Sequence, residues 1–205
     1  MKGFYMSIYD NLELWDEDLS GWHGNNQIFE RLIKEVNPHT IIEVGAWHGQ
    51  STINMAKILK EDNRDCHITT VDTWLGALEF IGADSGDRNL RMKNGYPQVY
   101  YQFLSNVVHN GVQDYITPLP TTSLIAARWF QKQNMTADLI YIDASHDYDD
   151  VRADIEAYWP LLNKGGIMFG DDYSTSMWPG VVEAVDGFFA FTTVENDNGF
   201  WVIRK

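Results

Sequence analysis

The sequence predicts an α/β fold in which helices cover both faces of a mainly parallel β-sheet. Short apolar segments alternate along the chain with stretches of helical periodicity, and this alternation is typical of parallel sheets. Glycines and acidic residues follow several of the apolar segments, where strands are expected to turn into helices. Near the C-terminus the pattern changes to two short apolar segments separated by only four turn-forming residues, which indicates an antiparallel hairpin.

Five segments are expected to form the parallel strands, and helical segments lie between them. The strands are predicted at 40–45, 67–72, 115–119, 138–143 and 166–170. The helices are predicted at 26–36, 51–59, 97–109, 122–133, 147–162 and 179–188.

The last two predicted strands, 192–195 and 200–203, flank the turn Asn196–Gly199. Two strands joined so closely must be antiparallel, because a parallel pair needs a long crossover connection. A dinucleotide-binding dehydrogenase would normally keep its sixth strand parallel, so the hairpin is unusual for that class.

The chain has 205 residues, the length of one domain, and we expect a single domain over 1–205. Two stretches interrupt the alternation of strands and helices. Residues 1–25 are polar and aromatic, and 73–96 form a long insertion rich in Gly and Asp. Loops of that length in a compact domain are usually functional lids or disordered segments, and we expect an N-terminal cap or lid and a lid insertion.

Composition excludes several function classes. The net charge is −14 and the 15 basic residues are scattered, which argues against a nucleic-acid partner. No apolar segment reaches 18 residues, and the N-terminus lacks the apolar stretch of a secretory signal, so neither a membrane partner nor secretion is expected. Cys66 is the single cysteine, expected to be a buried structural thiol. These features predict a cytoplasmic protein.

The loop after the first strand is the first candidate ligand site. Gly45 and Gly49 lie where a buried strand turns into a helix, and glycine there lets the backbone turn sharply and approach a ligand. Amide groups at the start of the following helix suit a carboxylate. Glu43 lies near the strand end, and Ser51 is placed to cap the helix and bind the ligand. The alternative is that both glycines only make a tight turn.

An acidic residue at the end of the second strand strengthens the case for a ligand. Asp72 lies 27 residues after Gly45, at a position suited to accept hydrogen bonds from ribose hydroxyls. Taken alone, Asp72 is better explained as a strand-end cap. The loop and the acid together favour a nucleoside cofactor.

Three further carboxylates follow neighbouring strands. Asp143 ends the fourth strand, and Asp171 and Asp172 end the fifth. The carboxyl ends of parallel strands meet at one edge, where open α/β sheets bind ligands. Three carboxylates so close repel one another unless they are protonated or bind a cation. Oxygen ligands without cysteine favour Mg²⁺, with Ca²⁺ or Mn²⁺ as alternatives. Each aspartate singly also suits a helix cap or a turn.

The segment from Glu43 to Ser51 reads Glu-Val-Gly-Ala-Trp-His-Gly-Gln-Ser. It resembles the first motif of the catechol O-methyltransferase group, Glu-x-Gly-x-x-x-Gly-x-Ser, within the class I S-adenosylmethionine-dependent methyltransferases. Later segments resemble the macrocin-type sugar O-methyltransferases, and the resemblance covers about residues 26–204. It implies a single-domain, three-layer Rossmann-like sheet of five parallel strands with a C-terminal antiparallel hairpin.

The same resemblance implies roles for individual residues. Glu43 and Gly49 complete the motif. The residues that would hold the methionine part of the cofactor are Gly45, Ala46, Trp47 and Ser51. Asp72 would hold the ribose, with Trp74 near the adenine. Ser123 falls where relatives contact the adenine, although Pro120–Ser123 lacks the acidic residue usual there.

Cation-dependent members carry an Asp after the fourth strand and an Asp-Asn or Asp-Asp pair after the fifth. Asp143, Asp171 and Asp172 match these metal positions. His146 falls where the catechol enzymes have a Lys general base, and histidine, with an ordinary pKa of about 6.5, is a sensible replacement. Asp143 is the other candidate base. His146 is equally explained as a helix N-terminal residue bonded to Asp147 or to backbone.

The sequence therefore predicts transfer of a methyl group from S-adenosylmethionine to a hydroxyl of a small molecule, such as a sugar or a catechol-like diol, with Mg²⁺ or another divalent cation. Two alternatives remain. A nicotinamide-dependent oxidoreductase is disfavoured by the missing Gly-x-Gly-x-x-Gly spacing. A non-catalytic nucleoside-binding module is disfavoured by the clustered aspartates. The oligomeric state is left open, a homo-oligomer included.

Overall fold

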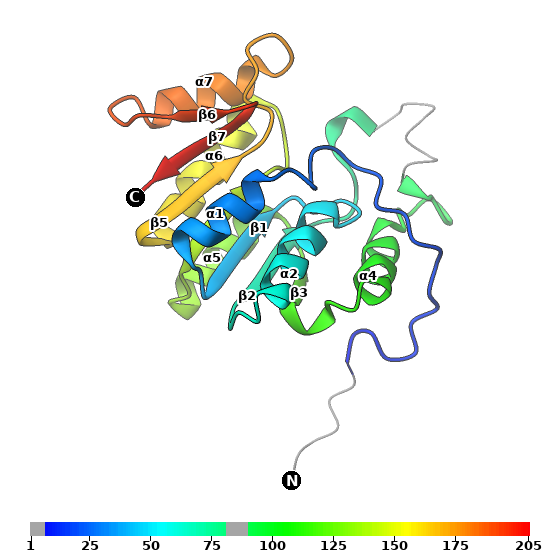
Figure 1. Ribbon diagram of the computed structural model, residues 1–205. Helices are drawn as coiled ribbons and strands as arrows, with labels where there is room; N and C mark the ends of the chain where they lie inside the picture. The colour runs from blue at the N-terminus through cyan, green and yellow to red at the C-terminus, as the bar shows by residue number, and fades with distance from the viewer. Residues whose placement is uncertain (1–6, 81–89) are drawn as a thin grey trace.

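The computed structural model of the chain describes residues 7–80 and 90–205. Residues 1–6 of the predicted N-terminal cap and 81–89 of the predicted lid insertion lie outside the described residues. In the described part, helices lie on both faces of one twisted sheet (Figure 1). The α/β fold predicted from the alternation of strands and helices is confirmed.

The strands occur in the sheet in the order β3-β2-β1-β4-β5-β7-β6. Their bounds are β1 Thr40–Val44, β2 His67–Asp72, β3 Ile116–Pro120, β4 Ala137–Ile142, β5 Leu162–Gly170, β6 Glu195–Asp197 and β7 Phe200–Arg204. The first five strands pair in parallel, and β7 pairs antiparallel with both β5 and β6. This is the predicted sheet of five parallel strands followed by an antiparallel hairpin.

The helices follow the predicted order. Their bounds are α1 Ile28–Val36, α2 Gln50–Glu61, α4 Val99–His109, α5 Ser123–Gln133, α6 Tyr148–Tyr158 and α7 Pro179–Phe188, with short 3₁₀ turns η1 Leu78–Phe80, η2 Gln113–Tyr115 and η3 Trp159–Leu161. The helix predicted at 147–162 ends early, at Tyr158. Pro160 favours the tighter turn η3, because proline cannot donate to a helix, and Leu162 already belongs to β5.

Two hydrophobic cores lie on opposite faces of the sheet. Successive residues of a strand point to opposite faces, so Ile41 packs in the core beneath α1 and α2, whereas Ile42 packs in the core beneath α5, α6 and α7. Both faces of the central strands are therefore buried. This explains why these strands are continuous apolar segments without polar alternation.

The C-terminal hairpin is tighter than predicted. The strand predicted at 192–195 begins only at Glu195, and the turn contains two residues in place of four. Asn198 and Gly199 adopt φ values of 54° and 98°, the left-handed pair that joins strands of a two-residue hairpin. Asn-Gly is the sequence that accepts this geometry most readily, so Asn196 joins the strand pairing.

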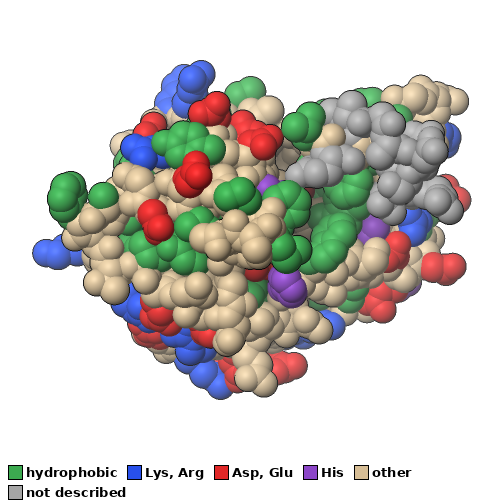
Figure 2. Space-filling view, turned by 90° about the horizontal axis from the view of Figure 1, so that it is seen from above, with side chains coloured by type: hydrophobic (Ala, Val, Ile, Leu, Met, Phe, Trp, Pro, Cys, Tyr) green, Lys and Arg blue, Asp and Glu red, His purple; other side chains and the backbone are tan. Residues whose placement is uncertain are grey.

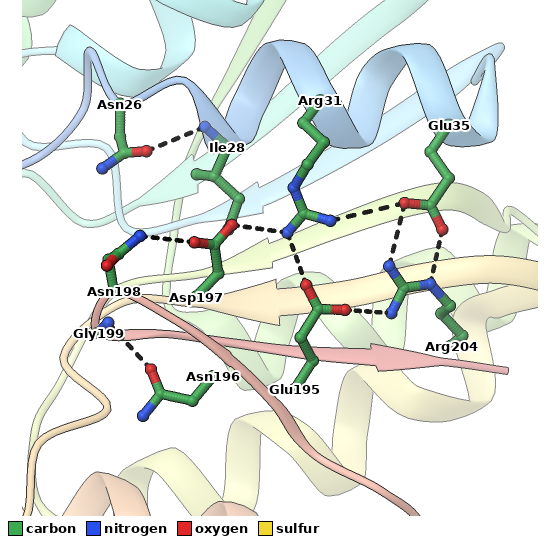
Figure 3. Close-up of polar contacts among 10 residues, drawn as sticks. All are labelled: Asn26, Ile28, Arg31, Glu35, Glu195, Asn196, Asp197, Asn198, Gly199 and Arg204. Carbon is green, nitrogen blue, oxygen red and sulfur yellow. Dashed lines mark hydrogen bonds and ion pairs between the residues drawn. The ribbon is translucent and has the colours of Figure 1, made fainter.

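Charged side chains attach the hairpin to α1 (Figure 3). Arg31 of α1 donates to Glu195 and to Asp197 of β6, both at 2.8 Å. Arg204 of β7 donates to Glu35 at 2.6 and 3.0 Å and to Glu195 at 2.6 Å. These contacts hold the end of the sheet against α1.

The hairpin turn also fixes the loop that follows β5. The Tyr173 backbone N–H donates to the Gly199 carbonyl at 2.7 Å. Gly170, at the end of β5, lies against the Trp201 ring, because a Cβ added at Gly170 would lie 2.5 Å from Trp201 Nε1. The position of the Asp171–Asp172 pair thus depends on β7 and its turn.

Two smaller expectations concern Cys66 and membrane spans. Cys66 is free and buried, as expected, and burial raises the pKa of its thiol to about 12, which keeps the thiol protonated. Among the residues that the structure describes, no helix has the length and apolar character needed to cross a bilayer.

Candidate active site

The carboxyl ends of β1, β2, β4 and β5 lie at one edge of the sheet and carry most of the predicted site residues. Figure 2 looks onto this edge from above and shows histidine and acidic side chains among hydrophobic ones. Two groups can be distinguished. One surrounds the loop after β1, and the other, here called the acidic rim, consists of Asp143, His146, Asp171 and Asp172.

Glu43 lies beneath the loop after β1 and is fully buried. Its carboxylate accepts hydrogen bonds from Ser51 Oγ at 2.5 Å, from Thr70 Oγ1 at 2.7 Å and from Thr52 Oγ1. Burial raises the pKa of Glu43 to about 7, although the three hydroxyl donors oppose this shift. Glu43 therefore joins β1 to α2 and β2 and supports the loop from inside the protein.

The two glycines of the loop are required by the packing of the protein itself. Gly45 has a φ of +88°, and a Cβ there would lie 1.9 Å from the Asp143 carbonyl oxygen. Gly49 has a φ of +89°, and a Cβ there would lie 2.8 Å from the Phe103 ring. The need for a tight turn explains both glycines. The close approach of Gly45 to the Asp143 carbonyl also places the loop directly beside the end of β4.

Ser51 does not cap α2 as predicted. The N-cap position is Gly49, which has no side chain to offer, and the Ser51 hydroxyl donates to Glu43. A hydrogen bond to a carboxylate is stronger than one to a backbone group, which explains the preference. The first turn of α2 is thus left without a side-chain cap, an arrangement suited to an anionic ligand group.

Asp72 connects the end of β2 to the loop after β1. Its Oδ2 accepts the backbone N–H groups of Ala46 at 2.8 Å and Trp47 at 2.9 Å, and its Oδ1 accepts the N–H of Trp74 at 2.7 Å. A carboxylate has about four acceptor positions, so one remains on Oδ1. Asp72 is therefore a loop anchor with room for one hydrogen bond from a ribose hydroxyl.

Aromatic rings stack around the same loop. Trp47, at a φ of 48°, lies between His48 and Phe80, with ring centroids 4.8 and 4.9 Å away. Trp74 donates from Nε1 to the Trp47 carbonyl at 2.9 Å and packs on Phe103. Trp74 is only 2% exposed, so the structure places it under the loop and not at a surface open to an adenine.

Ser123 begins α5, close to the end of β2 because the Thr121 N–H donates to the Asp72 carbonyl at 3.0 Å. The Ser123 hydroxyl bonds to the buried Asp154, and its carbonyl accepts from Tyr158 OH at 2.9 Å. These contacts direct Ser123 toward α6. The structure therefore adds no support for its predicted role at the adenine.

At the acidic rim, one ligand atom from each of Asp143, His146 and Asp172 lies within 4.8 Å of the others. His146 Nε2 lies 2.9 Å from Asp172 Oδ2, and Tyr141 OH donates to Asp143 Oδ2 at 2.8 Å. Burial, and then the negative charge of Asp171 opposite it, raise the pKa of Asp143 to about 7. The rim thus concentrates negative charge that a cation would compensate.

A small cavity of about 10 Å³ borders these residues, about the space of one water molecule or ion. Val181 and Trp201 form part of its apolar wall. The His146 ring stacks on Trp178 with centroids 3.9 Å apart and an angle of 23° between the ring planes. Trp178 precedes α7, so that helix sets the orientation of the imidazole.

Asp171 belongs to the same rim but has a different partner. Its Oδ2 accepts from His23 Nδ1 at 2.8 Å, and its Oδ1 accepts the Asp172 N–H at 2.7 Å. Burial raises the pKa of Asp171, and the hydrogen bond from His23 opposes the rise. Sequence reasoning missed His23, because nothing in its surroundings marks it apart from its place in the predicted cap.

Polar side chains of α4 hold the segment that leads to His23. Ser105 accepts the Trp15 N–H at 3.1 Å, and Asn106 accepts the Asp18 N–H at 2.9 Å. Asn106 also donates to the His48 carbonyl at 2.8 Å. The N-terminal segment is therefore attached to α4, and Asn106 also joins α4 to the loop after β1.

His48 lies between the loop and this segment and is 3% exposed. Its Nδ1 lies 3.2 Å from Ser20 Oγ, and burial lowers the pKa of the imidazole. His48 is thus packed as a neutral ring inside the loop.

Solved structures share this fold. The O-methyltransferase NovP superposes with a TM-score of 0.65 at 21% identity, over 89% of this chain and 79% of that one. CalS11, described as a TDP-rhamnose 3'-O-methyltransferase of calicheamicin biosynthesis, gives 0.62 at 19% identity, over 86% and 77%. An O-methyltransferase from Bacillus cereus, solved with SAH, gives 0.60 at 17% identity, over 94% and 84%. Such identities establish similarity of fold.

Among curated proteins, the uncharacterized protein R132 of Acanthamoeba polyphaga mimivirus is 39% identical over 54 residues, which are 26% of this chain and 24% of that protein. The match thus spans about a quarter of the relative's length. A family model described as a methyltransferase domain matches residues 42–173, well over half of the chain, from β1 to just beyond the Asp171–Asp172 pair. The chain therefore belongs to the methyltransferase domain family, as the resemblance of its first loop implied, and it shares its fold with solved O-methyltransferases.

Proposed function

We propose that the protein transfers the methyl group of S-adenosylmethionine to a hydroxyl of a small molecule, a sugar or a catechol-like diol, with a divalent cation bound at the acidic rim. The observation that carries this proposal is the group formed by Asp143, His146 and Asp172, whose ligand atoms lie within 4.8 Å of one another. The Asp143 carbonyl also lies against Gly45, so this group directly adjoins the loop after β1.

The donor set fits a hard divalent cation. The two carboxylates, with no thiolate beside them, suit Mg²⁺ or Mn²⁺. Burial, and after it the negative charge of Asp171, raises the pKa of Asp143, and a bound cation would oppose this rise. A cation held by Asp143, His146 and Asp172 would act as a Lewis acid and lower the pKa of an acceptor hydroxyl.

The cofactor fits the loop after β1. The first turn of α2 has no side-chain cap, and its backbone N–H groups are the candidates to bind the methionine carboxylate. Asp72 offers its remaining acceptor position to a ribose hydroxyl. The predicted contacts of the cofactor with Gly45, Ala46 and Trp47 would be made by the backbone of the loop.

The reaction is an in-line displacement. The acceptor oxygen forms a bond to the methyl carbon while the bond from that carbon to sulfur breaks, leaving S-adenosylhomocysteine. The proton of the hydroxyl would pass to His146 or to Asp143, whichever of the two does not bind the cation. The N-terminal segment reaches one side of the rim through the contact of His23 with Asp171.

The described activities of the structural neighbours support a hydroxyl acceptor. NovP is named an O-methyltransferase, and CalS11 is named as acting on the 3'-hydroxyl of a TDP-linked rhamnose. A sugar diol is thus a suitable first acceptor class to test.

The test uses labelled S-adenosylmethionine with a panel of sugar and catechol diols, each beside its mono-hydroxyl analogue. We expect label in the diols, loss of transfer after EDTA and recovery with added Mg²⁺. Full activity after EDTA would remove the cation from the proposal, and transfer only to amines or carbons would remove the hydroxyl acceptor.

A further inference from the structure

Tyr141 and Asp143 lie on the same side of the sheet at the end of β4. Successive residues of a strand point to opposite faces, so residues two apart share a face. The Asp143 N–H donates to the Val44 carbonyl at 2.8 Å, so the pairing with β1 continues through Asp143. Tyr141 packs in the core beneath α1 and α2, and its long side chain can therefore reach from that core to the acidic rim.

The tyrosine hydroxyl makes this contact. Tyr141 OH donates to Asp143 Oδ2 at 2.8 Å, and Tyr141 is fully buried. A hydrogen bond to a carboxylate is stronger than one between neutral groups. Because the pairing with β1 already fixes the backbone of Asp143, this hydrogen bond leaves the carboxylate little freedom to rotate.

The ring that carries the hydroxyl is held by two other aromatic rings. Tyr141 stacks on Phe169 of β5, with centroids 4.6 Å apart and an angle of 29° between the ring planes. It meets Phe29 of α1 edge-on, with centroids 5.1 Å apart. Both phenylalanines are fully buried. Packing in the core therefore fixes the position from which the hydroxyl donates.

The neighbouring strand shows that this part of the core does not require a hydroxyl. Tyr141 pairs with Phe169 in the register of β4 and β5, and both rings belong to the same core. Asp143 lies two residues after Tyr141, and Asp171 lies two residues after Phe169. A phenyl ring thus fills the equivalent place on β5. The hydroxyl on β4 is explained by its contact with the Asp143 carboxylate.

We propose that Tyr141 is a positioning residue of the cation site: its hydroxyl holds the Asp143 carboxylate in the orientation in which that carboxylate binds the cation. This inference rests on the cation of the proposed function. In the observed orientation, Asp143 offers a ligand atom within 4.8 Å of those of His146 and Asp172. Asp171 lines the same small cavity and stays available to the cation. A ligand that its neighbours already orient binds a metal more tightly.

The test measures Mn²⁺ affinity by calorimetry on the full chain, with no acceptor present. Tyr141→Phe removes only the hydroxyl and keeps the packed ring, and it should weaken Mn²⁺ binding by about tenfold or more. The affinity for S-adenosylhomocysteine, measured without Mn²⁺, should be unchanged, because the hydroxyl contacts Asp143 and not the loop after β1.

A double-mutant cycle separates this role from a general loss of structure. Asp143→Ala should weaken Mn²⁺ binding, because it removes a charged ligand. In the Asp143→Ala background, Tyr141→Phe should weaken binding no further, because the carboxylate on which the hydroxyl acts is gone.

Tyr158→Phe provides a matched control. Tyr158 is also fully buried, but its hydroxyl donates to the Ser123 carbonyl at 2.9 Å, and its ring packs in the other core. Both phenylalanine variants should lower the melting temperature, because each removes a buried hydrogen bond. Only Tyr141→Phe should weaken Mn²⁺ binding. The rise in melting temperature on adding Mn²⁺ gives an independent readout, and it should be smaller in Tyr141→Phe than in the wild type or in Tyr158→Phe.

Failure of the proposed function has a different signature. If the wild-type chain binds no Mn²⁺, the cation and this inference are both wrong. If it binds Mn²⁺ and Tyr141→Phe binds equally tightly, or Tyr158→Phe weakens binding as much, the inference alone is wrong. A further loss of affinity when Tyr141→Phe is added to Asp143→Ala would also overturn it, because Tyr141 would then act on the fold and not on Asp143.

Discussion

Asp72 Oδ2 accepts the backbone N–H of Trp47 at 2.9 Å, so the acidic residue that ends β2 holds the loop that follows β1. The same oxygen binds the N–H of Ala46, and the other oxygen binds the N–H of Trp74. One carboxylate thus fixes the shape of the loop and retains a position for the ribose. Loop geometry and cofactor binding are therefore expected to fail together when Asp72 is changed.

Asp72→Asn should weaken cofactor binding by about tenfold or more and lower the free energy of unfolding by about 1–3 kcal/mol, because one backbone donor loses its acceptor. Calorimetry with S-adenosylhomocysteine and urea unfolding measure the two effects.

Asp138 provides a matched control at the opposite edge of the sheet. Its Oδ2 accepts the N–H groups of His39 and Thr40, and its Oδ1 accepts from Asn163, which repeats the pattern at Asp72. Asp138→Asn should lower stability by a similar amount and leave cofactor affinity unchanged. Equal losses of affinity in the two variants would show that Asp72 acts only through stability.

Gly45→Ala should prevent stable folding. The added Cβ would lie 1.9 Å from the Asp143 carbonyl oxygen, and at a φ of +88° the side chain would also be strained. Neither β1 nor β4 can move without disturbing the centre of the sheet. Gly165 has a similar φ, +83°, with open space around it, so Gly165→Ala should cost only about 1 kcal/mol. Thermal unfolding of both variants measures the difference, and similar melting temperatures would contradict the packing argument.

Glu43→Gln should change how stability depends on pH. The pKa of Glu43 rises from an ordinary 4.5 to about 7 in the folded chain, mainly through burial. The folded state therefore holds the proton more tightly than the unfolded state, and this contribution is complete below pH 4.5 and is lost as pH rises through 7. Between pH 4.5 and pH 7.5, the free energy of unfolding of Glu43→Gln should therefore rise by about 3 kcal/mol relative to that of the wild type.

Glu35 provides a control of opposite sign. The hydrogen bond from Arg204 lowers the pKa of Glu35, so its contribution is present above the ordinary pKa and is lost on acidification. Glu35→Gln should therefore remove stability at neutral pH and not at low pH. Urea unfolding across this range measures both variants, and parallel curves for wild type and Glu43→Gln would refute the assignment.

Trp178→Leu should lower turnover by about tenfold and leave cofactor affinity unchanged. The indole stacks on His146 at 3.9 Å and sets the plane of the imidazole at the rim. Without the stack, the ring loses its orientation toward Asp172 and the acceptor. Trp129, an exposed tryptophan on α5, supplies the control, since Trp129→Leu should have no effect. Single-turnover measurements separate chemistry from binding, and an unchanged rate in Trp178→Leu would exclude the orienting role.

Much of the fold could be predicted because local patterns carry it. The apolar segments around Ile42 and Ile140 predicted buried strands, and both strands are buried on two faces. The turn-forming segment Asn196–Gly199 predicted the hairpin, because two strands joined so closely must be antiparallel, although the turn proved shorter than expected. The end of α6 was missed because Pro160 shifted the chain into a 3₁₀ turn before β5.

For the site, the sequence by itself determined which residues reach the carboxyl edge, because the ends of parallel strands must meet there. Asp72, Asp143 and Asp172 needed no more than this rule. Only the tertiary structure decided what each side chain contacts. The Ser51 hydroxyl donates to Glu43, and the Asp171 carboxylate accepts from His23, a residue 148 positions away in the chain. Such choices depend on which donors packing brings within hydrogen-bonding distance, and no local pattern in the sequence records that.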